Sequence, residues 1–282
     1  MPFKTILVTG CSAGGIGAAV AVALAKRGHH VFATARSVSK IPPELSALPN
    51  VTVLPLDVAS ASSAAEAAQA VAASGRPLDV LLNNAGAGYS MPVLDVDVDQ
   101  AMRVYDANVL GVVRAVQAFA PMLIESKGRV VNVSSCGATV NAPVVRLYKG
   151  RSYHSLRDAA PGAVPVRRRR HHHHGGAIAT HFHDNEPEFK LPAGSLYAPI
   201  EGIIAGWASG KSKPGVGPAE EFVESIMDDV VGDGRKGGLV WKGPHAGSIK
   251  FIANWLPAWC QDAAMSVNQG LKELTQHLIS NK

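Results

Sequence analysis

Thr9-Gly10-Cys11-Ser12-Ala13-Gly14-Gly15-Ile16-Gly17 is the stretch that decides the fold of this chain. It follows a short apolar run at 4–8, typical of a buried strand, and precedes an Ala-rich run at 18–25, which predicts a helix that ends near Gly28. Glycines after a strand let the backbone turn sharply and approach a phosphate closely. The following helix directs free N–H groups and its positive dipole end at that charge. Strand, glycine cluster and helix in this order predict a site for a nucleotide phosphate.

Length and composition describe an ordered globular protein with one sizeable core. The chain has 282 residues, of which 47% are hydrophobic and 17% are charged. Its three cysteines, Cys11, Cys136 and Cys260, are widely spaced, which is typical of a reducing compartment and favours neither a disulfide framework nor a metal site. The first strand begins at once and no uninterrupted apolar run reaches about 18 residues. We therefore expect neither a targeting peptide nor a membrane span.

Strand and helix patterns alternate in the first half of the chain, and ordinary patterns resume after residue 176. Val- and Leu-rich runs predict strands at 30–34, 52–56, 79–82, 129–133 and 238–241. Ala-rich or periodic runs predict helices at 60–73, 99–126, 196–207 and 220–231. Buried strands separated by helices imply a parallel sheet covered on both faces. The predicted fold class is therefore α/β, with a single domain over 1–282 and one Rossmann-type doubly wound sheet.

Residues 146–174 differ in character from the rest of the chain. They contain eight Lys or Arg residues and one acid, Asp158, which gives this segment a net charge of +7. The whole chain has a net charge of +5, so the other residues together carry −2. Four arginines (167–170) are followed by four histidines (171–174), and the segment has neither a helical nor a strand period. A nucleic-acid footprint would spread basic residues over a folded face. The charge therefore does not indicate a nucleic-acid partner.

Several motifs together resemble the short-chain dehydrogenase/reductase family, and they cover most of the chain except 146–174. They are the glycine-rich stretch 9–17, Asn83-Asn84-Ala85-Gly86, Asn108, Val131-Asn132-Val133-Ser134-Ser135 and residues 176–180. Within that family, the paired glycines 14 and 15 and the Trp-containing tail are similar to fungal 1-acyldihydroxyacetone-phosphate reductases. The resemblance implies a nicotinamide cofactor and the reduction of a carbonyl to an alcohol by hydride transfer.

The resemblance also implies where the cofactor binds. The pyrophosphate would be lined by the glycine-rich turn, unless this is an ordinary strand–helix turn. The residues concerned are Gly10, Ser12, Gly15, Ile16 and Gly17. Arg36 follows the second predicted strand, where an NAD-selective site would offer an acid. Because a guanidinium suits a phosphate, Arg36 favours NADPH over NADH; a solvated surface arginine is the alternative.

Three more polar residues belong to the implied cofactor site. Asp57 resembles the residue that contacts the adenine ring, and it could also cap the helix that follows. Asn84 would hold the adenosine side of the cofactor and brace the sheet. Thr180, at the end of the last motif, completes the cofactor set.

The catalytic groups implied by the resemblance are a serine, a tyrosine and a lysine. Ser135 fits the serine that positions the substrate oxygen, and Tyr148, 13 residues later, fits the tyrosine that donates the proton. Asn108 fits the residue that holds a water near the lysine, a solvent-facing asparagine being the alternative. The lysine is expected one helical turn after the tyrosine, at a position that is occupied by Ser152.

Without that lysine, no cation would lower the pKa of the phenol. Lys149 follows Tyr148 directly and would point about a quarter turn away from it on a helix. The alternative function is therefore a catalytically impaired or inactive nucleotide-binding protein of the same family.

One hypothesis explains both the missing lysine and the odd segment by a displaced reading frame over 146–174. A one-base shift in codons for Val-Arg-Val-Val-Thr-Ile-Ile-Thr yields arginine codons followed by histidine codons, where the family has its hydrophobic sixth strand. Under this hypothesis the catalytic lysine, its helix and a central strand are lost, and Tyr148 matches its spacing by chance. The other interpretations are a solvated loop, a basic patch for membranes or nucleic acid, or a metal site formed by the histidines.

The predicted partner is a small carbonyl or alcohol, with neither nucleic acid nor metal. Six apolar side chains after Thr180 favour an acyl or lipid-like substrate, unless they are ordinary core. They are Phe182, Phe189, Leu191, Leu196, Tyr197 and Trp207. The apolar C-terminal tail (246–282) would contact a membrane surface, pack as a helix or form a homodimer. We expect a cytoplasmic protein, or one on the cytosolic face of the endoplasmic reticulum or of lipid droplets.

Overall fold

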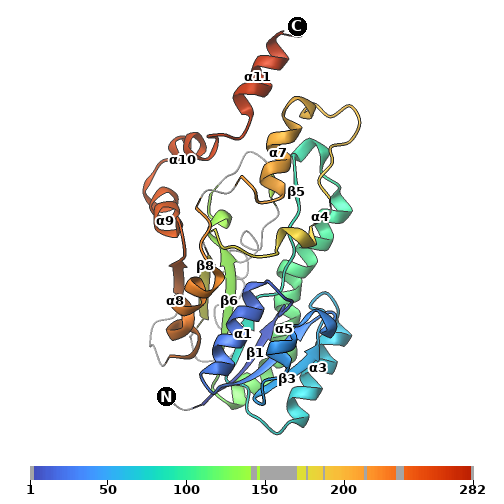
Figure 1. The fold of residues 1–282 in the computed structure, drawn as a ribbon, viewed down its shortest axis with the longest axis vertical. Helices are drawn as coiled ribbons and strands as arrows, with labels where there is room; N and C mark the ends of the chain where they lie inside the picture. The colour runs from blue at the N-terminus through green and yellow to red at the C-terminus, as the bar shows by residue number, and fades with distance from the viewer. Residues whose placement is uncertain are drawn as a thin grey trace.

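A seven-stranded parallel sheet forms the centre of the molecule (Figure 1). The computed structural model describes residues 3–140, 145–146, 170–175, 177–186, 188–212, 215–232 and 238–280. The sheet has the order β3-β2-β1-β4-β6-β8-β9, with every neighbouring pair parallel. Its strands are β1 (Thr5–Thr9), β2 (His30–Ala35), β3 (Val51–Pro55), β4 (Val80–Asn83), β6 (Arg129–Ser135), β8 (Arg170–Gly175) and β9 (Gly238–Lys242). The predicted α/β fold with a doubly wound parallel sheet is confirmed.

The direction in which strands are added to the sheet reverses between β1 and β4. From β1 the chain moves outward through β2 to β3, and it returns to β4 on the other side of β1, in the register Leu7↔Leu81. In sheets of this kind the loops after the two central strands diverge, and ligands bind in the crevice at the carboxyl ends of these strands. The loops that follow Thr9 and Asn83 lie at this position.

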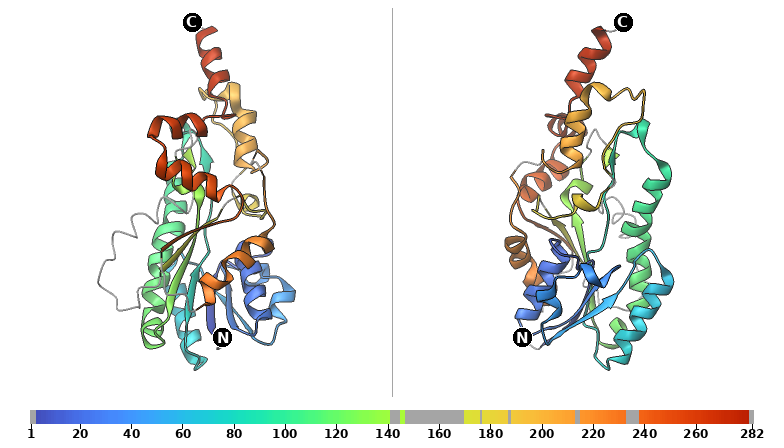
Figure 2. Two further views of the ribbon diagram at one scale, coloured as in Figure 1. Left: turned by 90° about the vertical axis from the view of Figure 1, so that its left-hand side faces the viewer. Right: turned by 45° about the vertical axis from the view of Figure 1, so that its right-hand side comes forward.

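Helices cover both faces of the sheet, as Figure 2 shows from two further directions. On one face α1 (Ile16–Lys26) packs against α8 (Ala219–Val231). On the other face α3 (Ala61–Ala73) packs against α5 (Gly111–Glu125).

The two faces enclose separate hydrophobic cores. Ile6 and Val8 of β1 belong to the core that includes Phe222 of α8, whereas Leu7 belongs to the core that includes Phe119 of α5. Successive residues of a strand point to opposite faces of a sheet. The continuous apolar sequence of β1 therefore serves both cores.

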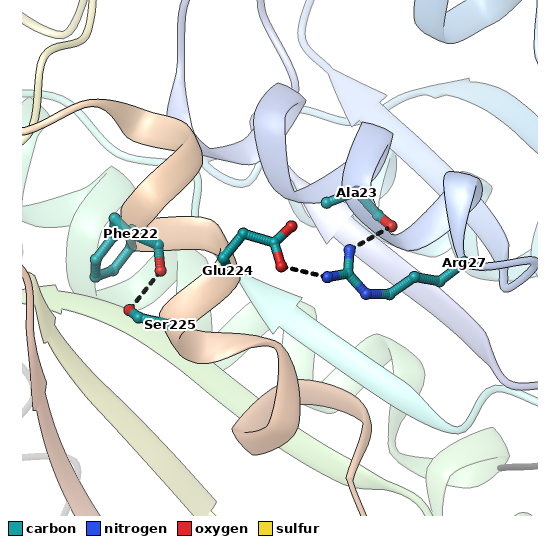
Figure 3. Close-up of polar contacts among 5 residues, drawn as sticks. All are labelled: Ala23, Arg27, Phe222, Glu224 and Ser225. Atoms are coloured by element: carbon teal, nitrogen blue, oxygen red, sulfur yellow. Dashed lines mark hydrogen bonds and ion pairs between the residues drawn. The ribbon is translucent and has the colours of Figure 1, made fainter.

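An ion pair joins α1 and α8 at the surface (Figure 3). Nη2 of Arg27 contacts Oε2 of Glu224, and Nη1 of Arg27 donates a hydrogen bond of 3.1 Å to the carbonyl oxygen of Ala23. The two charged side chains are 37% and 61% exposed. The pair thus lies at the rim of a contact whose centre is apolar.

The longest helical segment, Val98–Glu125, is continuous through α4 (Val98–Tyr105), a π-helical turn η3 (Asp106–Leu110) and α5. By length and composition alone this segment is apolar enough to cross a membrane, although helices in the cores of soluble proteins meet the same criteria. The sequence predicts no membrane span because no uninterrupted apolar run is long enough. In this segment Asp106 and Arg114 interrupt the apolar sequence. Burial of Phe119 and Leu123 against the sheet explains why the helix is apolar.

Strand β8 lies in the segment whose sequence has no strand period. Residues Arg170–Gly175 pair with β6 in the register Val131↔His171 and with β9 in the register His172↔Leu239. The backbone of these residues therefore occupies a strand position of the sheet, the strand that the reading-frame hypothesis counts as lost in sequence. Strand pairing uses main-chain N–H and C=O groups that every non-proline residue carries, so an atypical side-chain sequence does not prevent it. The reading-frame hypothesis stays a hypothesis, and Tyr148 and Ser152 lie outside the described residues.

The predicted apolar tail is helical. It consists of α9 (Ala246–Trp255), α10 (Ala258–Met265) and α11 (Leu271–Ser280), and α11 extends away from the sheet (Figure 1). Trp255 and Trp259 are 76% and 72% exposed. Whether this tail belongs to a single domain with the sheet stays a prediction.

Short elements complete the described chain, several of them near the carboxyl edge of the sheet. They are η1 (Val38–Lys40), α2 (Pro43–Ser46), β5 (Ser90–Met91), η2 (Val93–Asp95), η4 (Cys136–Ala138), β7 (Val145–Arg146), η5 (His183–Asn185), η6 (Ala198–Ile200) and α7 (Glu201–Ala208). β5 and β7 form a small antiparallel pair. Together η6 and α7 cover 198–208, close to the helix predicted at 196–207.

Candidate functional site

The turn between β1 and α1 has no space for side chains at Gly10 and Gly17. Gly10 has a φ of +75°, and a Cβ on it would lie 2.7 Å from Cα of Ala85. A Cβ on Gly17 would collide with the side-chain amide of Asn84 and with the carbonyl oxygen of Gly10. Two of the glycines predicted to line a pyrophosphate, Gly10 and Gly17, are therefore required by the packing of the turn.

The first turn of α1 leaves its N–H groups open to an anion. Gly15 is the N-cap residue and makes no side-chain cap hydrogen bond, and no acidic residue lies in the first turn, which begins with Ile16. Gly15 N–H donates to the carbonyl oxygen of Ser12 at 3.2 Å, which closes the turn. The positive end of the helix dipole is thus not neutralised by its own side chains.

The same turn is held by the end of β2 and the loop after it. Cys11 N–H donates to the carbonyl oxygen of Thr34 at 2.8 Å, and Ala13 N–H donates to that of Lys40 at 2.8 Å. The Cys11 side chain is fully buried, and burial raises the pKa of its thiol to about 12. Cys11 is therefore a packed neutral group in the site.

Asn84 connects the loop after β4 to the end of β1. Its Nδ2 donates to the carbonyl oxygens of Thr9 and Gly10, at 2.9 and 3.0 Å. Its N–H, like that of Ala85, donates to Oγ1 of Thr9 at 2.9 Å. The loop after β4 is thereby fixed against the glycine-rich turn at the point where the strand order reverses.

Arg36 and Asp57 lie at the carboxyl ends of β2 and β3. Arg36 is exposed, and its side chain makes no hydrogen bond or ion pair with the described residues. Oδ1 of Asp57 accepts a hydrogen bond of 3.0 Å from Ala59 N–H. The cap of α3 is Ser60, whose hydroxyl accepts from Ser63 N–H at 3.2 Å. The alternative that Asp57 caps this helix is therefore wrong.

Asn108 is buried, and its side chain is bound to one peptide unit. It is 2% exposed, its Oδ1 accepts from Ala87 N–H at 2.9 Å and its Nδ2 donates to the carbonyl oxygen of Ala87 at 2.9 Å. The alternative of a solvent-facing asparagine is therefore wrong. Asn108 lies in the π-helical turn, a local irregularity that recurs at functional sites.

Ser135 ends β6 at the same edge of the sheet. Ser135 lies opposite Gly175 of β8. It is three residues beyond Asn132, and Asn132 pairs with Asn83, the last residue of β4. Its hydroxyl accepts a hydrogen bond of 3.2 Å from Gly137 N–H. The structure thus brings Ser135 to the edge that also holds the glycine-rich turn and the Asn84 loop, while Tyr148 lies outside the described residues.

The segment after β8 contains Thr180, which the resemblance places in the cofactor site and which is half-buried. It is followed by residues that the sequence did not assign to the site. The first of them, His181, donates from its N–H to the carbonyl oxygen of Gly14 at 3.1 Å. The imidazole of His181 covers Gly14, because a Cβ on Gly14 would lie 2.5 Å from its Nδ1. Farther along, Nδ1 of His183 lies 2.8 Å from Oε1 of Glu186, and both side chains are buried. Their spacing of three residues was a signal that the sequence contained.

Comparisons with known proteins agree with this geometry. Residues 4–150 match the short chain dehydrogenase family. The short-chain dehydrogenase ptmH of Penicillium ochrochloron is 33% identical over 270 residues, which is 93% of this chain and 96% of that protein. The NADPH-dependent 1-acyldihydroxyacetone phosphate reductase of Schizosaccharomyces pombe is 32% identical over 240 residues, 82% of this chain and 80% of that protein. The chain therefore belongs to the short-chain dehydrogenase family of oxidoreductases, and the predicted resemblance is confirmed.

Solved structures share the fold. A short chain dehydrogenase from Burkholderia cenocepacia J2315 in complex with NADP has a TM-score of 0.72 at 23% identity, covering 93% of this chain and 97% of that one. One from Streptomyces avermitilis has a TM-score of 0.74 at 22% identity, covering 99% and 98%. At these identities the likeness establishes the Rossmann-type fold.

Proposed function

We propose that this oxidoreductase reduces a carbonyl compound to an alcohol with NADPH as its cofactor. One observation carries the proposal. The main chain at Gly10 and Gly17 is packed so closely that a Cβ there would collide with neighbouring atoms, and the first turn of α1 beside it has no side-chain cap. A cofactor diphosphate fits this arrangement, because it needs close main-chain approach and free N–H groups. When bound, NADPH supplies the hydride.

Arg36 supports a preference for NADPH over NADH. It follows β2 directly, is exposed, and belongs to a stretch, 33–36, that contains no acid. A guanidinium there would pair with a ribose phosphate, whereas an acid would bind the ribose hydroxyls of NADH. The name of the Schizosaccharomyces pombe relative, which is NADPH-dependent, supports the same preference.

The chain's own residues would divide the remaining work. The Ser135 hydroxyl would hold the substrate oxygen, and the Tyr148 phenol would donate a proton to it. Asn108 would support the site by fixing Ala87 and the loop after β4. Asp57, Asn84 and Thr180 would contact the cofactor from the neighbouring loops.

A second function is favoured by one feature of the sequence. The position one helical turn after Tyr148 is occupied by Ser152, so no ammonium group lies there to lower the pKa of the phenol. The alternative is accordingly a protein that binds NADPH but turns over slowly or not at all. Loss of one such electrostatic partner costs on the order of a hundredfold in rate.

Turnover and binding separate these two functions. The test measures NADPH oxidation with a panel of aldehydes and ketones, and NADPH binding by fluorescence, for the wild type, Ser152→Lys and Ser152→Gln. Reductase activity in the wild type supports the first function. Binding without turnover, rescued about a hundredfold by Ser152→Lys and not by Ser152→Gln, supports the second. Absence of NADPH binding in all three proteins contradicts both.

Homodimer formation, membrane contact of the tail and a cytoplasmic location stay predictions. Exposure of Trp255 and Trp259 supports a surface contact of the tail. Sedimentation equilibrium would test the dimer, and flotation with phosphatidylcholine vesicles would test the membrane contact.

A further inference from the structure

His181 brings a polar ring to the glycine-rich turn from a distant part of the chain. Its N–H binds the carbonyl oxygen of Gly14, and its imidazole lies on the same residue, where a Cβ would be 2.5 Å from Nδ1. Gly14 has a φ of +69° and directly precedes Gly15, the N-cap residue of α1. The ring therefore lies beside the helix N-terminus to which the proposed function assigns the cofactor diphosphate.

The turn itself has no cationic side chain to offer a diphosphate. Residues 9–17 contain neither Lys, Arg nor His, so the turn would hold an anion mainly through main-chain N–H groups and the helix dipole. A donor from another segment would add a charge-assisted hydrogen bond. His181 can provide one, because an imidazole carries at least one ring N–H in either protonation state.

The imidazole of His181 is open to solvent and therefore to a ligand. Its side chain is 71% exposed. Oδ2 of Asp184 lies 3.9 Å from its Nδ1, and the Asp184 side chain is 73% exposed. At this distance and exposure the attraction between the two side chains is weak. Asp184 is thus a weak competitor of a diphosphate for the ring.

Buried contacts fix the backbone that follows His181. The ring of His183 packs on Gly210, where a Cβ would lie 2.6 Å from its Cδ2. Glu186 packs on Gly88, and its Oε1 lies 2.8 Å from Nδ1 of His183, with both side chains buried. The exposed ring of His181 is therefore carried by an anchored main chain, so that less conformational entropy is lost when it binds a ligand.

We propose that His181 is a further binding residue for the cofactor, whose imidazole donates a hydrogen bond to the diphosphate at the first turn of α1. The proposal rests on the proposed function, because its ligand is the diphosphate of the same cofactor. It also assigns a role to Gly14. Without a side chain at Gly14, the ring can lie directly on the turn.

Two ligands distinguish a contact with the diphosphate from a general effect on the site. NADPH contains the diphosphate, whereas adenosine 2′-monophosphate contains the adenosine and the ribose phosphate without it. Fluorescence titration measures the dissociation constant for NADPH, and displacement of NADPH measures that for adenosine 2′-monophosphate.

His181→Phe keeps a ring over Gly14 and removes both ring nitrogens. We expect the dissociation constant for NADPH to rise about tenfold and that for adenosine 2′-monophosphate to stay unchanged. His181→Gln restores an N–H donor without the ring and should recover most of the affinity for NADPH. Because the side chain of His181 is exposed, urea unfolding should show equal stability of these proteins.

His277→Phe is the matched control. His277 is an exposed histidine of α11, which extends away from the sheet. Its replacement should leave both dissociation constants unchanged.

The outcomes separate this proposal from the proposed function. Weaker NADPH binding by His181→Phe, without turnover of any aldehyde or ketone by the wild type, supports the assignment of His181 and contradicts the reductase function. Reductase activity together with equal NADPH affinity in the wild type and His181→Phe overturns the assignment alone. An equal loss of affinity for both ligands, or tighter binding of NADPH by His181→Phe, also overturns it. Absence of NADPH binding by the wild type overturns both.

Discussion

Gly17 of α1 and Asn84 after β4 are packed so closely that a Cβ on Gly17 would lie 2.4 Å from Nδ2 of Asn84. That Nδ2 donates to the carbonyl oxygens of Thr9 and Gly10, at 2.9 and 3.0 Å. Three elements, β1, α1 and β4, therefore meet at one side-chain amide. The shape of the predicted cofactor site depends on this contact, because both carbonyls belong to the turn that would hold the diphosphate.

Gly17→Ala should disturb the site and the fold together. The new methyl group must displace Asn84 or the turn, which we expect to lower the free energy of unfolding by about 1–3 kcal/mol. The dissociation constant for NADPH should rise about tenfold or more, since positions of the turn carbonyls and N–H groups change together. Urea unfolding and NADPH fluorescence titration measure the two effects.

Gly202→Ala is the control for that substitution. Gly202 lies in α7 with open space around its Cα, so alanine there should stabilise the helix by up to ~1 kcal/mol and leave NADPH binding unchanged. If Gly17→Ala behaved like Gly202→Ala in both measurements, the close contact with Asn84 would have no energetic weight.

Arg36→Gln should reduce the preference for the phosphorylated cofactor. Loss of the guanidinium removes charge-assisted hydrogen bonds, so we expect the dissociation constant for NADPH to rise roughly tenfold or more and that for NADH to change little. Arg76→Gln, in an exposed residue before β4 at the opposite edge of the sheet, is the control. An equal loss of NADPH and NADH affinity in Arg36→Gln would assign to Arg36 a role other than phosphate recognition.

Much of the fold was predictable because the strands carry strong local signals. Val8 and Leu81 lie in short apolar runs bounded by turn residues, and runs of this kind are typical of parallel strands buried on both faces. β8 was not predictable in this way. Its sequence, arginine and histidines with one glycine, has no strand period, and its assignment depends on main-chain pairing with β6 and β9.

The site was predictable only in part, because its contacts connect residues that are distant in sequence. Gly10 and Asn84 belong to motifs, and the structure brings them together. The partner of Asn108 is Ala87, an apolar residue that acts through its peptide group, and no pattern of side chains identifies such a partner. The burial of Glu186 against Gly88 likewise depends on the tertiary fold.

Asn108→Leu should destabilise the protein. Leucine has the same branched side-chain shape as asparagine but has no groups that form hydrogen bonds. The N–H and carbonyl groups of Ala87 would lose their partners in a buried place, a cost of about 1–3 kcal/mol for a buried group left unpaired. Urea unfolding measures it. The matched control is Asn254→Leu, because Asn254 is an exposed helical asparagine of α9, where a change within about 0.5 kcal/mol is expected. Equal stability of the two variants would contradict a structural role for the Ala87 contact.

Cys11 should make the folded state sensitive to alkaline pH. Burial raises the pKa of its thiol from 9.0 to about 12, so the folded state keeps a proton that the unfolded state releases. The stabilisation is complete below pH 9 and is lost as the pH rises from there toward 12, by up to about 1.4 kcal/mol per pH unit. Urea unfolding between about pH 8 and pH 11 should show a steeper decline of the unfolding free energy for the wild type than for Cys11→Ala. Parallel curves would contradict burial of a neutral thiol.

The ion pair between Arg27 and Glu224 (Figure 3) should contribute little to stability despite its short contact. Both side chains are more than one third exposed, so water and salt screen their attraction, and ordering two long side chains costs entropy. A double-mutant cycle with Arg27→Gln and Glu224→Gln should give a coupling free energy of about 0.2–1 kcal/mol that decreases with added salt. A coupling free energy that is several times larger and independent of salt would show that solvent is excluded from the ion pair between α1 and α8. That result would contradict the exposed fractions of the two side chains.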